Sequence, residues 1–376
     1  MLHTTSTFTA LSLEELRALP LTIDGVHFIG SKRNVFIGRY QDQEGFLGDL
    51  ARFLKDWRSA SPTMTVHTSG STGAPKPIQV EKARMANSAM ATCQSLRLTA
   101  GMTALLAMPL RYIAARMVVV RALLAGLNLL PVTPSSSPFK DVHQHIDFAA
   151  LTPMQTYTSL ETKDTADRLR KVNCLLLGGG AINADLAKEL ADFPNEVWSS
   201  YGMTETLSHI ALRRVNGPNA SDWYTPLPGV TVRLHEEGML IIHAPMVTTH
   251  DLVTTDLAEM DDQGRFRILG RCDNIINSGG IKIQLEEVED LLSSVLKKPF
   301  CVTALPDACL GEKLCLLHTG GENPEALETI CRHVLPKYWV PKTFLLADAI
   351  PLTKTGKIRR GETRRLAAQL AAKRED

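Results

Sequence analysis

The sequence lacks three features that would each point to a particular class of protein: an excess of one charge, a long apolar run and a leader peptide. Its 41 lysine and arginine residues are balanced by 40 aspartate and glutamate residues, which leaves a formal net charge of +1. This balance argues against nucleic acid or an anionic membrane as the main partner. The most apolar stretch, residues 114–130, is interrupted by Arg116, Arg121 and Asn128, so no membrane span is expected. Residues 1–20 have no basic start followed by an apolar core, and we therefore expect a cytoplasmic protein.

The sequence also lacks any pair of cysteines at the C-x-x-C spacing of zinc knuckles and redox centres. Its seven cysteines are an odd number, which argues against a disulfide framework, and we expect reduced thiols that pack in the core. With 376 residues, of which 44% are hydrophobic and 22% charged, the chain can bury a large core. It is long enough for two or three domains.

Over the first part of the chain, the apolar pattern alternates between strands and helices. Short β-rich runs are expected at 63–67, 102–108, 127–132 and 172–177, and amphipathic helices at 44–57, 82–96 and 113–125. Alternation of this kind is typical of α/β layers around mostly parallel strands. Residues 68–76 would then form a loop that leads from a strand into a helix.

The pattern changes in the last third of the chain, where short strands and hairpins replace this alternation. Residues 239–243 and 265–269 are typical of strands, and 261–264 of a hairpin turn. After residue 271 comes a segment of about a hundred residues, which is the size of a separate domain. We predict an α/β N-terminal domain at 1–271, a hinge at 272–273 and a small α+β lid domain at 274–376.

The loop after residue 67 reads T-S-G-S-T-G-A-P-K and has two interpretations, a flexible linker or a phosphate-binding loop. It is not a Walker A loop, because Lys76 lies between Pro75 and Pro77 and no helix can begin there. Its glycines, hydroxyls and lysine nevertheless suit a polyphosphate. The residues concerned are Thr68, Ser69, Gly70, Ser71, Thr72, Gly73 and Lys76.

This string resembles a signature of the acyl-adenylate-forming superfamily, which includes acyl-CoA synthetases, adenylation domains and luciferases. Further strings resemble that family's motifs in the same order, and together they cover almost the whole chain. They are Gly178-Gly179-Gly180-Ala181, Tyr201-Gly202-Met203-Thr204-Glu205, Asp256, Gly270-Arg271-Cys272-Asp273, Gly279-Gly280 and Pro351 to Lys357. Usual members have more residues before the glycine loop, so the resemblance implies a shortened front end.

The resemblance implies ATP, Mg²⁺ and coenzyme A as ligands and a small carboxylic acid as substrate. It implies that residues 68–76 and Thr204 meet the phosphates, that 178–181, Tyr201 and Gly202 line the adenine pocket, and that Glu205 binds the metal. It further implies Asp256 and Arg271 as ribose contacts, Lys357 as a catalytic residue, Asp273 as the hinge pivot, and Gly279 and Gly280 in a loop for thioester formation. Thr255 stands where the family usually has glycine.

Each of these strings also has a purely structural interpretation. Residues 201–205 could be a turn before a helix N-cap, 178–180 an ordinary turn between a strand and a helix, and the C-terminal lysines part of an exposed basic tail. A regulator that binds nucleotide without turnover should have lost Glu205 or Lys357, and both are present.

Residues 109–121 give information about the acid substrate. In the family this segment has an aromatic residue or histidine, followed by a helix that lines the acyl pocket. Tyr112 takes the first position, and the helix carries Arg111, Arg116 and Arg121, which argues against a fatty acid. Arg121 lies among apolar residues and could bind a substrate carboxylate or pair with an internal one. The segment resembles the o-succinylbenzoate–CoA ligases of menaquinone biosynthesis, whose substrate is a dicarboxylate. An aryl-CoA synthetase and a homodimer both remain open.

Overall fold

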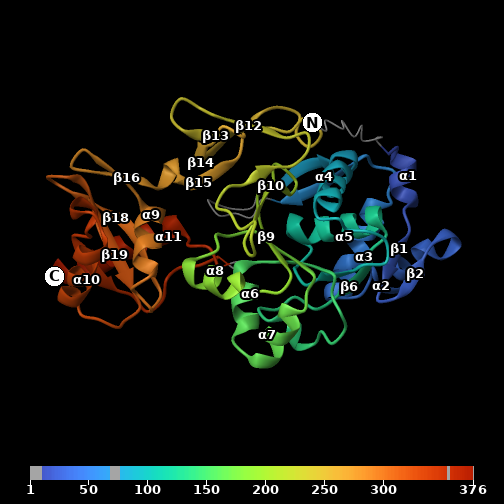
Figure 1. The fold of residues 1–376 in the computed structure, drawn as a ribbon, viewed down its shortest axis with the longest axis horizontal. Coiled ribbons are helices and arrows are strands. Elements are labelled where there is room, and N and C mark those ends of the chain that lie inside the picture. Colours follow the sequence, from blue (N-terminus) through green and yellow to red (C-terminus); the bar gives the residue numbers. More distant parts are fainter. Residues whose placement is uncertain (1–10, 68–76, 354–355, 376) are drawn as a thin grey trace.

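The computed structural model describes residues 11–67, 77–353 and 356–375, and the predicted phosphate loop at 68–76 lies outside them. A large part ends near residue 271, and a smaller part follows it to the C-terminal helix (Figure 1). No helix within the described ranges is long and apolar enough to cross a membrane.

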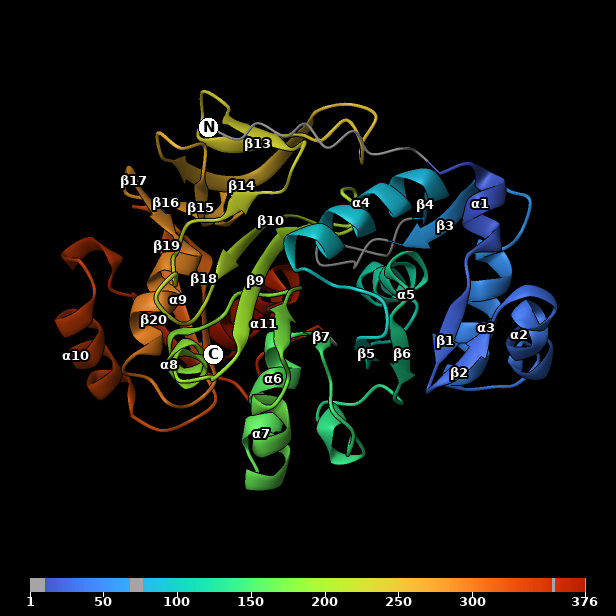
Figure 2. The same cartoon turned by 45° about the vertical axis from the view of Figure 1, so that its right-hand side comes forward.

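The large part is built on a nine-stranded sheet with the order β11-β10-β9-β8-β7-β5-β6-β1-β2 (Figure 2). The six strands from β9 to β1 run parallel, whereas the outer strands β2, β10 and β11 pair antiparallel. The strands are β1 (Leu21–Ile23), β2 (Val26–Phe28), β5 (Thr103–Leu106), β6 (Asn128–Pro131), β7 (Phe148–Leu151), β8 (Cys174–Leu177), β9 (Glu196–Gly202), β10 (His209–Arg214) and β11 (Thr225–Pro226). The predicted α/β layering around parallel strands is confirmed.

The sheet separates two hydrophobic cores, because successive residues of its strands point to opposite faces. In β8, Cys174 and Leu176 enter one core, whereas Leu175 and Leu177 enter the other. Residues of α3, α4 and α5 fill the first core, and residues of α7 and α8 fill the second. The helices of this part are α1 (Leu13–Ala18), α2 (Val35–Tyr40), α3 (Phe46–Trp57), α4 (Lys82–Ser95), α5 (Ile113–Ala125), α6 (Pro153–Leu160), α7 (Lys163–Arg170) and α8 (Ala184–Ala191), with short 3₁₀ turns η1 (Gly30–Asn34) and η2 (Pro138–Lys140).

The segment after the glycine loop differs from the sequence prediction of a loop that leads into a helix. Pro77–Glu81 forms a strand, β4, that pairs antiparallel with β3 (Thr63–His67). Apolar Ile78 and Val80 alternate with polar neighbours, which is the period of a strand, and proline is tolerated as its first residue. The predicted phosphate loop therefore joins two strands of a hairpin, and α4 begins only at Lys82.

A four-stranded antiparallel sheet completes the large part beside the main one. Its strands are β12 (Thr231–Leu234), β13 (Met239–His243), β14 (Leu252–Met260) and β15 (Phe266–Arg271), in that order. The predicted turn at 261–264 joins β14 to β15, with Gly264 N donating to Asp261 O at 3.0 Å.

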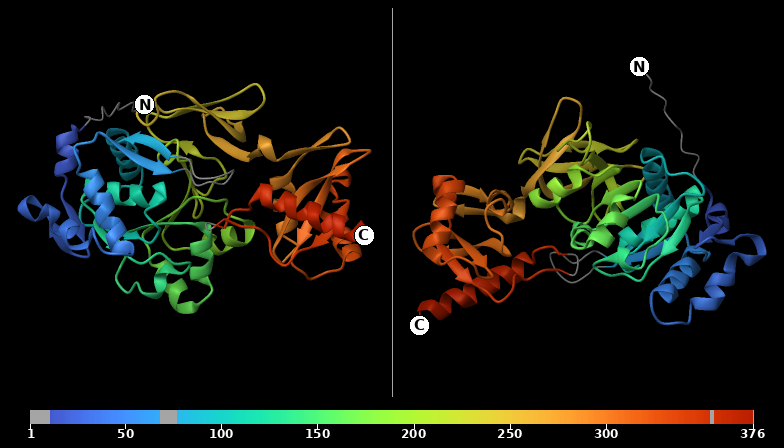
Figure 3. Two further views of the ribbon diagram at one scale, coloured as in Figure 1. Left: turned by 180° about the vertical axis from the view of Figure 1, so that it is seen from behind. Right: turned by 60° about the horizontal axis from the view of Figure 1, so that its bottom comes forward.

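The smaller part is an α+β unit around a five-stranded sheet with β17-β16-β19-β18 in order and β20 beside β19. Figure 3 shows it at one end of the molecule, with α11 on the side that faces the large part. Its elements are η3 (Cys272–Asn274), β16 (Ile275–Ser278), β17 (Ile281–Gln284), α9 (Leu285–Ser293), β18 (Phe300–Asp307), β19 (Gly311–His318), α10 (Pro324–Val334), η4 (Lys337–Trp339), β20 (Thr343–Leu346) and α11 (Arg360–Glu375). The predicted boundary at 272–273 falls within η3, and its action as a hinge stays a prediction.

Candidate active site

The carboxyl ends of three neighbouring parallel strands bring several of the sequence motifs to one edge of the main sheet. Gly178 follows β8, Tyr201 and Gly202 end β9, and Thr152 follows β7. Ligands of open α/β sheets bind at this edge. Ser200 Oγ donates to Leu177 O at 2.8 Å and ties the two strand ends together.

The glycines after β8 have a local structural reason. A Cβ atom on Gly178 would lie 2.6 Å from Ser200 Oγ, and Gly179 adopts a left-handed φ of +79°. Gly180 has no such constraint, since a Cβ there would only contact Pro153 at 3.7 Å. The chain needs two of the three glycines for its own packing, so a role of residues 178–181 beside adenine stays a prediction.

The Tyr201–Glu205 string forms the start of a tight connection between β9 and the antiparallel strand β10. A Cβ atom on Gly202 would lie 2.3 Å from Ser208 O, and only glycine fits there. Thr206 Oγ1 accepts from Met203 N at 2.9 Å and lies 2.7 Å from Ser208 O. The alternative of a helix N-cap is wrong, because a strand follows the turn.

The two residues of this turn with predicted roles differ in exposure. Thr204 is buried, whereas Glu205 is exposed and has no hydrogen-bond or ion-pair partner among the described residues. No group of three or more metal-ligating side chains occurs within the described parts of the chain. The donor set therefore fits Mg²⁺ only in the manner usual for nucleotide enzymes, with one carboxylate and the remaining ligands from phosphate and water.

Tyr201, Asp256 and Arg271 meet in one cluster. Tyr201 Oη donates to Asp256 Oδ2 at 2.5 Å, and burial together with Asp256 raises the pKa of the Tyr201 hydroxyl. Asp256 and Arg271 are partners across β14 and β15, and Arg271 Nη1 lies 3.9 Å from Asp256 Oδ1. The Tyr201 ring packs edge-on against Phe266, with centroids 5.2 Å apart.

Lys357 belongs to the smaller part of the chain and has no ion pair or side-chain hydrogen bond among the described residues. Desolvation lowers the pKa of its ammonium, with Asp256 opposing this effect and Arg271 adding to it, although the surface of the side chain is exposed. A tight turn holds the residue, because Thr353 N donates to Lys357 O at 2.7 Å and Lys357 N donates to Thr353 Oγ1 at 3.0 Å. The Lys357 side chain is itself exposed, so the alternative of an exposed basic tail stays open.

A contact between the two parts seats the Lys357 turn. Gly356 adopts a left-handed φ of +84°, and a Cβ atom there would approach Met154 Sδ to 3.4 Å. Met154 lies in the first turn of α6, after the N-cap Thr152 that follows β7. The strand edge with the glycines therefore also supports the lysine turn.

The predicted ribose contact and the predicted hinge pivot are bonded to each other. Arg271 Nε and Nη2 donate to the two carboxylate oxygens of Asp273 at 2.9 and 2.8 Å, and Arg271 lowers the pKa of that carboxyl. Gln284 Nε2 donates to Arg271 O at 3.1 Å across the same junction. The sequence did not predict this pairing.

Ion pairs within the smaller part connect the junction to the Lys357 turn. Arg360 makes a bidentate pair with Glu289, at 2.7 and 2.6 Å, and lies 3.4 Å from Glu286. Glu286 also accepts a hydrogen bond from Asn274 in η3. A continuous set of charged and polar contacts thus joins η3, α9 and the start of α11.

Gly279 and Gly280 form the two-residue turn between β16 and β17. Both have left-handed φ angles, 61° and 84°, as the commonest tight hairpin turn requires. A Cβ atom on Gly279 would lie 2.9 Å from Leu310 Cδ2. These constraints account for both glycines, and their role in thioester formation stays a prediction.

The three arginines of α5 and its approach have different environments. Arg111 is exposed and stacks on Tyr112 at 4.8 Å, and Arg116 donates to Leu110 O at 2.7 Å and Thr65 O at 2.6 Å. Only Arg121 is fully buried, with 2% of its surface exposed. The sequence analysis used three arginines as evidence against a fatty acid as substrate. In the structure only Arg121 supports that argument, because only Arg121 is fully buried.

Arg121 has no acidic partner among the described residues, so the alternative of an internal ion pair is wrong for this part of the chain. Its Nη2 donates to Ser208 Oγ at 2.7 Å, and its Nε is buried without a partner. Burial lowers the pKa of the guanidinium to about 10.

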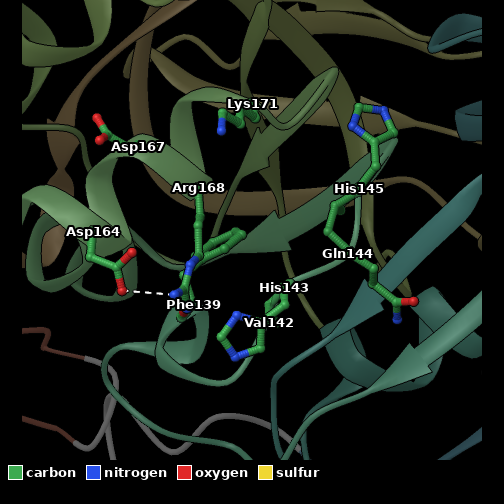
Figure 4. A pocket seen from close by; sticks show the side chains of 10 residues that line it. Phe139, Val142, His143, Gln144, His145, Asp164, Asp167, Arg168 and Lys171 are labelled. Carbon is green, nitrogen blue, oxygen red and sulfur yellow. Dashed lines mark hydrogen bonds and ion pairs between the residues drawn. The ribbon is translucent and has the colours of Figure 1, made fainter.

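A surface cavity of about 430 Å³ lies away from this site (Figure 4). His145 and Lys171, which line it, come just before β7 and β8, at the amino ends of the strands. Arg168 Nη2 pairs with Asp164 at 2.8 Å across the same cavity. His143 and His145, which also line this cavity, are exposed.

Comparison with known proteins agrees with this geometry at the level of the family. A family model described as AMP-binding enzyme matches residues 32–245, which is more than half of the chain. The protein belongs to the AMP-binding enzyme family.

Individual relatives fall within the same family. The chain is 26% identical to a 2-succinylbenzoate–CoA ligase of Bacillus mycoides, in an alignment of 357 positions that covers 85% of this chain and 73% of the relative. A 2-succinylbenzoate–CoA ligase of Lactococcus lactis is 26% identical, in an alignment of 326 positions that covers 82% of this chain and 72% of the relative.

Among solved structures, an acyl-CoA synthetase (AMP-forming)/AMP-acid ligase II-like protein from Dyadobacter fermentans is 34% identical, with a TM-score of 0.60 and coverage of 86% of this chain and 95% of that one. The o-succinylbenzoate coenzyme A synthetase of Bacillus subtilis, in complex with ATP and magnesium, has a TM-score of 0.68 at 23% identity over 80% of this chain and 69% of that one. The second likeness shows the fold, with its large N-terminal and small C-terminal domains.

Three residues near the site were not predicted from the sequence. Met154 supports the Lys357 turn, and Ser208 and His209 lie directly behind the Tyr201–Glu205 turn, in contact with Arg121 or with each other. Ser208 and His209 come a few positions after the Tyr201–Glu205 string. Their place behind that turn depends on strand β10, which was not predicted from the sequence.

Proposed function

We propose that the protein is an ATP-dependent acid–thiol ligase with o-succinylbenzoate as its acid. In the first half-reaction a substrate carboxylate oxygen attacks the α-phosphorus of ATP, the bond to the β-phosphate oxygen breaks, and acyl-AMP and pyrophosphate form. In the second, the thiolate of coenzyme A attacks the acyl carbon and AMP leaves.

One arrangement carries the proposal: Asp256 contacts both Tyr201 and Arg271, and Gly356, next to Lys357 in the C-terminal part, lies beside Met154 at the same edge of the sheet. Two anions must approach each other for the first half-reaction, and positive groups fixed in place beforehand stabilise the charge that develops. The Lys357 ammonium would supply such a charge at the phosphate, and Arg271 and Asp256 would hold the ribose.

The remaining nucleotide contacts follow from the same edge of the sheet. Residues 68–76 would hold the phosphates, residues 178–181, Tyr201 and Gly202 would form the adenine pocket, and Thr204 would meet the α-phosphate. Glu205 would hold Mg²⁺, which when bound neutralises phosphate charge. Its exposed carboxylate, which has no partner in the described chain, is the feature that supports this role.

The identity of the acid is supported by Arg121 and by the relatives. A buried guanidinium without an internal carboxylate is suited to an external one, and a planar fork matches a carboxylate in two hydrogen bonds. The second carboxylate of o-succinylbenzoate would fill this position, with Tyr112 at the start of the helix. Relatives at 26% identity are 2-succinylbenzoate–CoA ligases.

For the second half-reaction we propose that the unit at 274–376 rotates against the unit at 1–271. The pivot would be Asp273, within the hinge at 272–273, and the turn with Gly279 and Gly280 would replace the Lys357 turn beside the adenylate. A fixed lid could not serve both steps, because the amine needed for adenylation would occupy the path of the thiol.

Release of pyrophosphate from ATP and Mg²⁺, measured with a panel of acids, tests this function. We expect release with o-succinylbenzoate and none above background with benzoate or octanoate. Equal release with benzoate would instead assign an aryl-CoA synthetase. No release with any acid would contradict the ligase and favour a nucleotide-binding regulator.

A further inference from the structure

A chain of buried hydrogen bonds runs from Arg121 into the core behind the Tyr201–Glu205 turn. Arg121 Nη2 lies 2.7 Å from Ser208 Oγ, which lies 3.3 Å from His209 Nδ1. His209 Nε2 lies 3.0 Å from Thr92 Oγ1, which donates to Ser88 O at 3.1 Å. Arg121, His209 and Thr92 are 2%, 6% and 0% exposed, whereas Ser208, which joins the first two, is half-buried.

The last bond of the chain determines the direction of all the others. Ser88 O only accepts, so the single hydroxyl proton of Thr92 is donated to it, and Thr92 Oγ1 must accept from His209 Nε2–H. A neutral imidazole carries one N–H, which leaves Nδ1 as an acceptor for the Ser208 hydroxyl. Ser208 Oγ is then free to accept from the guanidinium, which only donates.

The surroundings of His209 keep it in this neutral form. Burial, together with the positive charge of Arg121, holds the pKa of the imidazole well below its usual range. A protonated ring would carry N–H groups on both nitrogens, and Ser208 would then face one donor on each side. The ordered chain therefore depends on a histidine that stays uncharged beside a cation.

We propose that His209 is a positioning residue for acid recognition: through Ser208 it holds the Arg121 guanidinium so that the remaining N–H groups receive the second carboxylate of a dicarboxylic acid. This inference rests on the proposed function and deepens it. The Arg121 Nε, buried and without a partner in the described chain, is the donor that such a carboxylate would satisfy. A buried donor left unpaired is costly, and a bound carboxylate removes that cost.

If His209 positions Arg121, its substitution should change the KM for o-succinylbenzoate but not the KM for ATP. If His209 only packs in the core, the two KM values should not respond differently. His209→Leu removes the acceptor for Ser208, so the KM for o-succinylbenzoate should rise about tenfold, as expected for one hydrogen bond that supports a charged group. The KM for ATP should change less than about twofold, since only the backbone of Ser208 and His209 lies against Gly202 and the substituted side chains bond to no residue assigned to the nucleotide. His209→Gln, which retains an acceptor and a donor, should recover part of the loss.

Two further variants keep the test decisive. Ser208→Ala interrupts the relay at its first bond and should raise the same KM, even if the leucine variant does not fold. His318→Gln is the matched control, because His318 is also 6% exposed but lies in β19 of the smaller part, and it should leave both KM values unchanged.

The possible outcomes separate the relay from the function on which it rests. A wild-type protein that ignores o-succinylbenzoate overturns both. A wild-type protein that uses it, with folded His209 and Ser208 variants whose two KM values stay unchanged or rise together, overturns the relay alone.

Discussion

At the scale of single residues, Lys357 shows how far apart in the chain the members of one charged cluster can lie. Asp256 and Arg271 act on its ammonium from strands β14 and β15, and Gly356 seats its turn against Met154 in α6.

We expect Lys357→Ala to slow adenylate formation at least about a hundredfold, because it removes a preorganised positive charge from the transition state. Binding of ATP should be largely retained, since other residues would hold the base and ribose. Single-turnover formation of acyl-AMP is the measurement, and Lys337→Ala, at an exposed lysine of the same unit, is the control. A loss of less than tenfold in the Lys357 variant would remove it from the catalytic machinery.

The buried His209 links stability to pH. In the unfolded chain a histidine binds a proton below about pH 6.5, whereas the folded protein keeps His209 neutral to a lower pH. The unfolded state therefore binds more protons in this window, and acid favours it. The stabilisation is complete above about pH 6.5 and decreases as the pH falls toward the folded pKa, with a slope of up to about 1.4 kcal/mol per pH unit.

Urea unfolding at pH 7.5 and pH 5.5 measures this effect. We expect the wild type to lose about 1 kcal/mol more than His209→Gln between the two pH values, because the variant has no imidazole to protonate. Identical losses in both proteins would show that His209 is not kept neutral by the fold.

At the scale of elements, the helices and strands with a strong apolar period were predictable, and α5 begins and ends at the residues expected, Ile113 and Ala125. The strand β4 was not predicted, because five residues with a leading proline carry a weak signal beside the long helix α4. Pairing with β3 overrides that weak local preference.

The candidate site was predictable only as a set of motifs. Short strings at fixed spacing point to Tyr201, Asp256 and Lys357, but the hydrogen bond between Tyr201 and Asp256 depends on the pairing of distant strands. The opposition of Asp256 to Arg271 follows the register of β14 and β15, which includes an irregularity between Leu257 and Ala258. No local pattern specifies such a register.

The short element η3 is where we expect a substitution to separate the two half-reactions. Asp273→Pro fixes a backbone angle at the proposed pivot and should leave acyl-AMP formation within about threefold of wild type while thioester formation falls at least about tenfold. Both rates are measured by quenched flow with o-succinylbenzoate.

The control for this prediction is Asp273→Ala, which removes the bond to Arg271 but keeps the backbone free to turn. It should form the thioester faster than the proline variant. If proline lowers both half-reactions equally, or if alanine reproduces its effect, η3 does not act as the pivot.

At the scale of the whole molecule, the residues of the candidate site come from both parts of the chain. The strand edge of the large part carries Tyr201 and the turn with Glu205, helix α5 carries the buried Arg121, and the small part carries Lys357. If the proposed function holds, a truncated large part would retain the proposed contacts to the acid and the adenine but lose the proposed catalytic amine of Lys357.

The ion pairs that join Arg360 to Glu289 and Glu286, and Glu286 to Asn274, have a consequence for the order of events. They brace the small part internally, so it would turn as a block and could not bend while the Lys357 turn stays in place. Withdrawal of the Lys357 amine and arrival of the Gly279–Gly280 turn would then be one movement. One molecule would therefore be arranged either for adenylation or for thioester formation, and not for both at once.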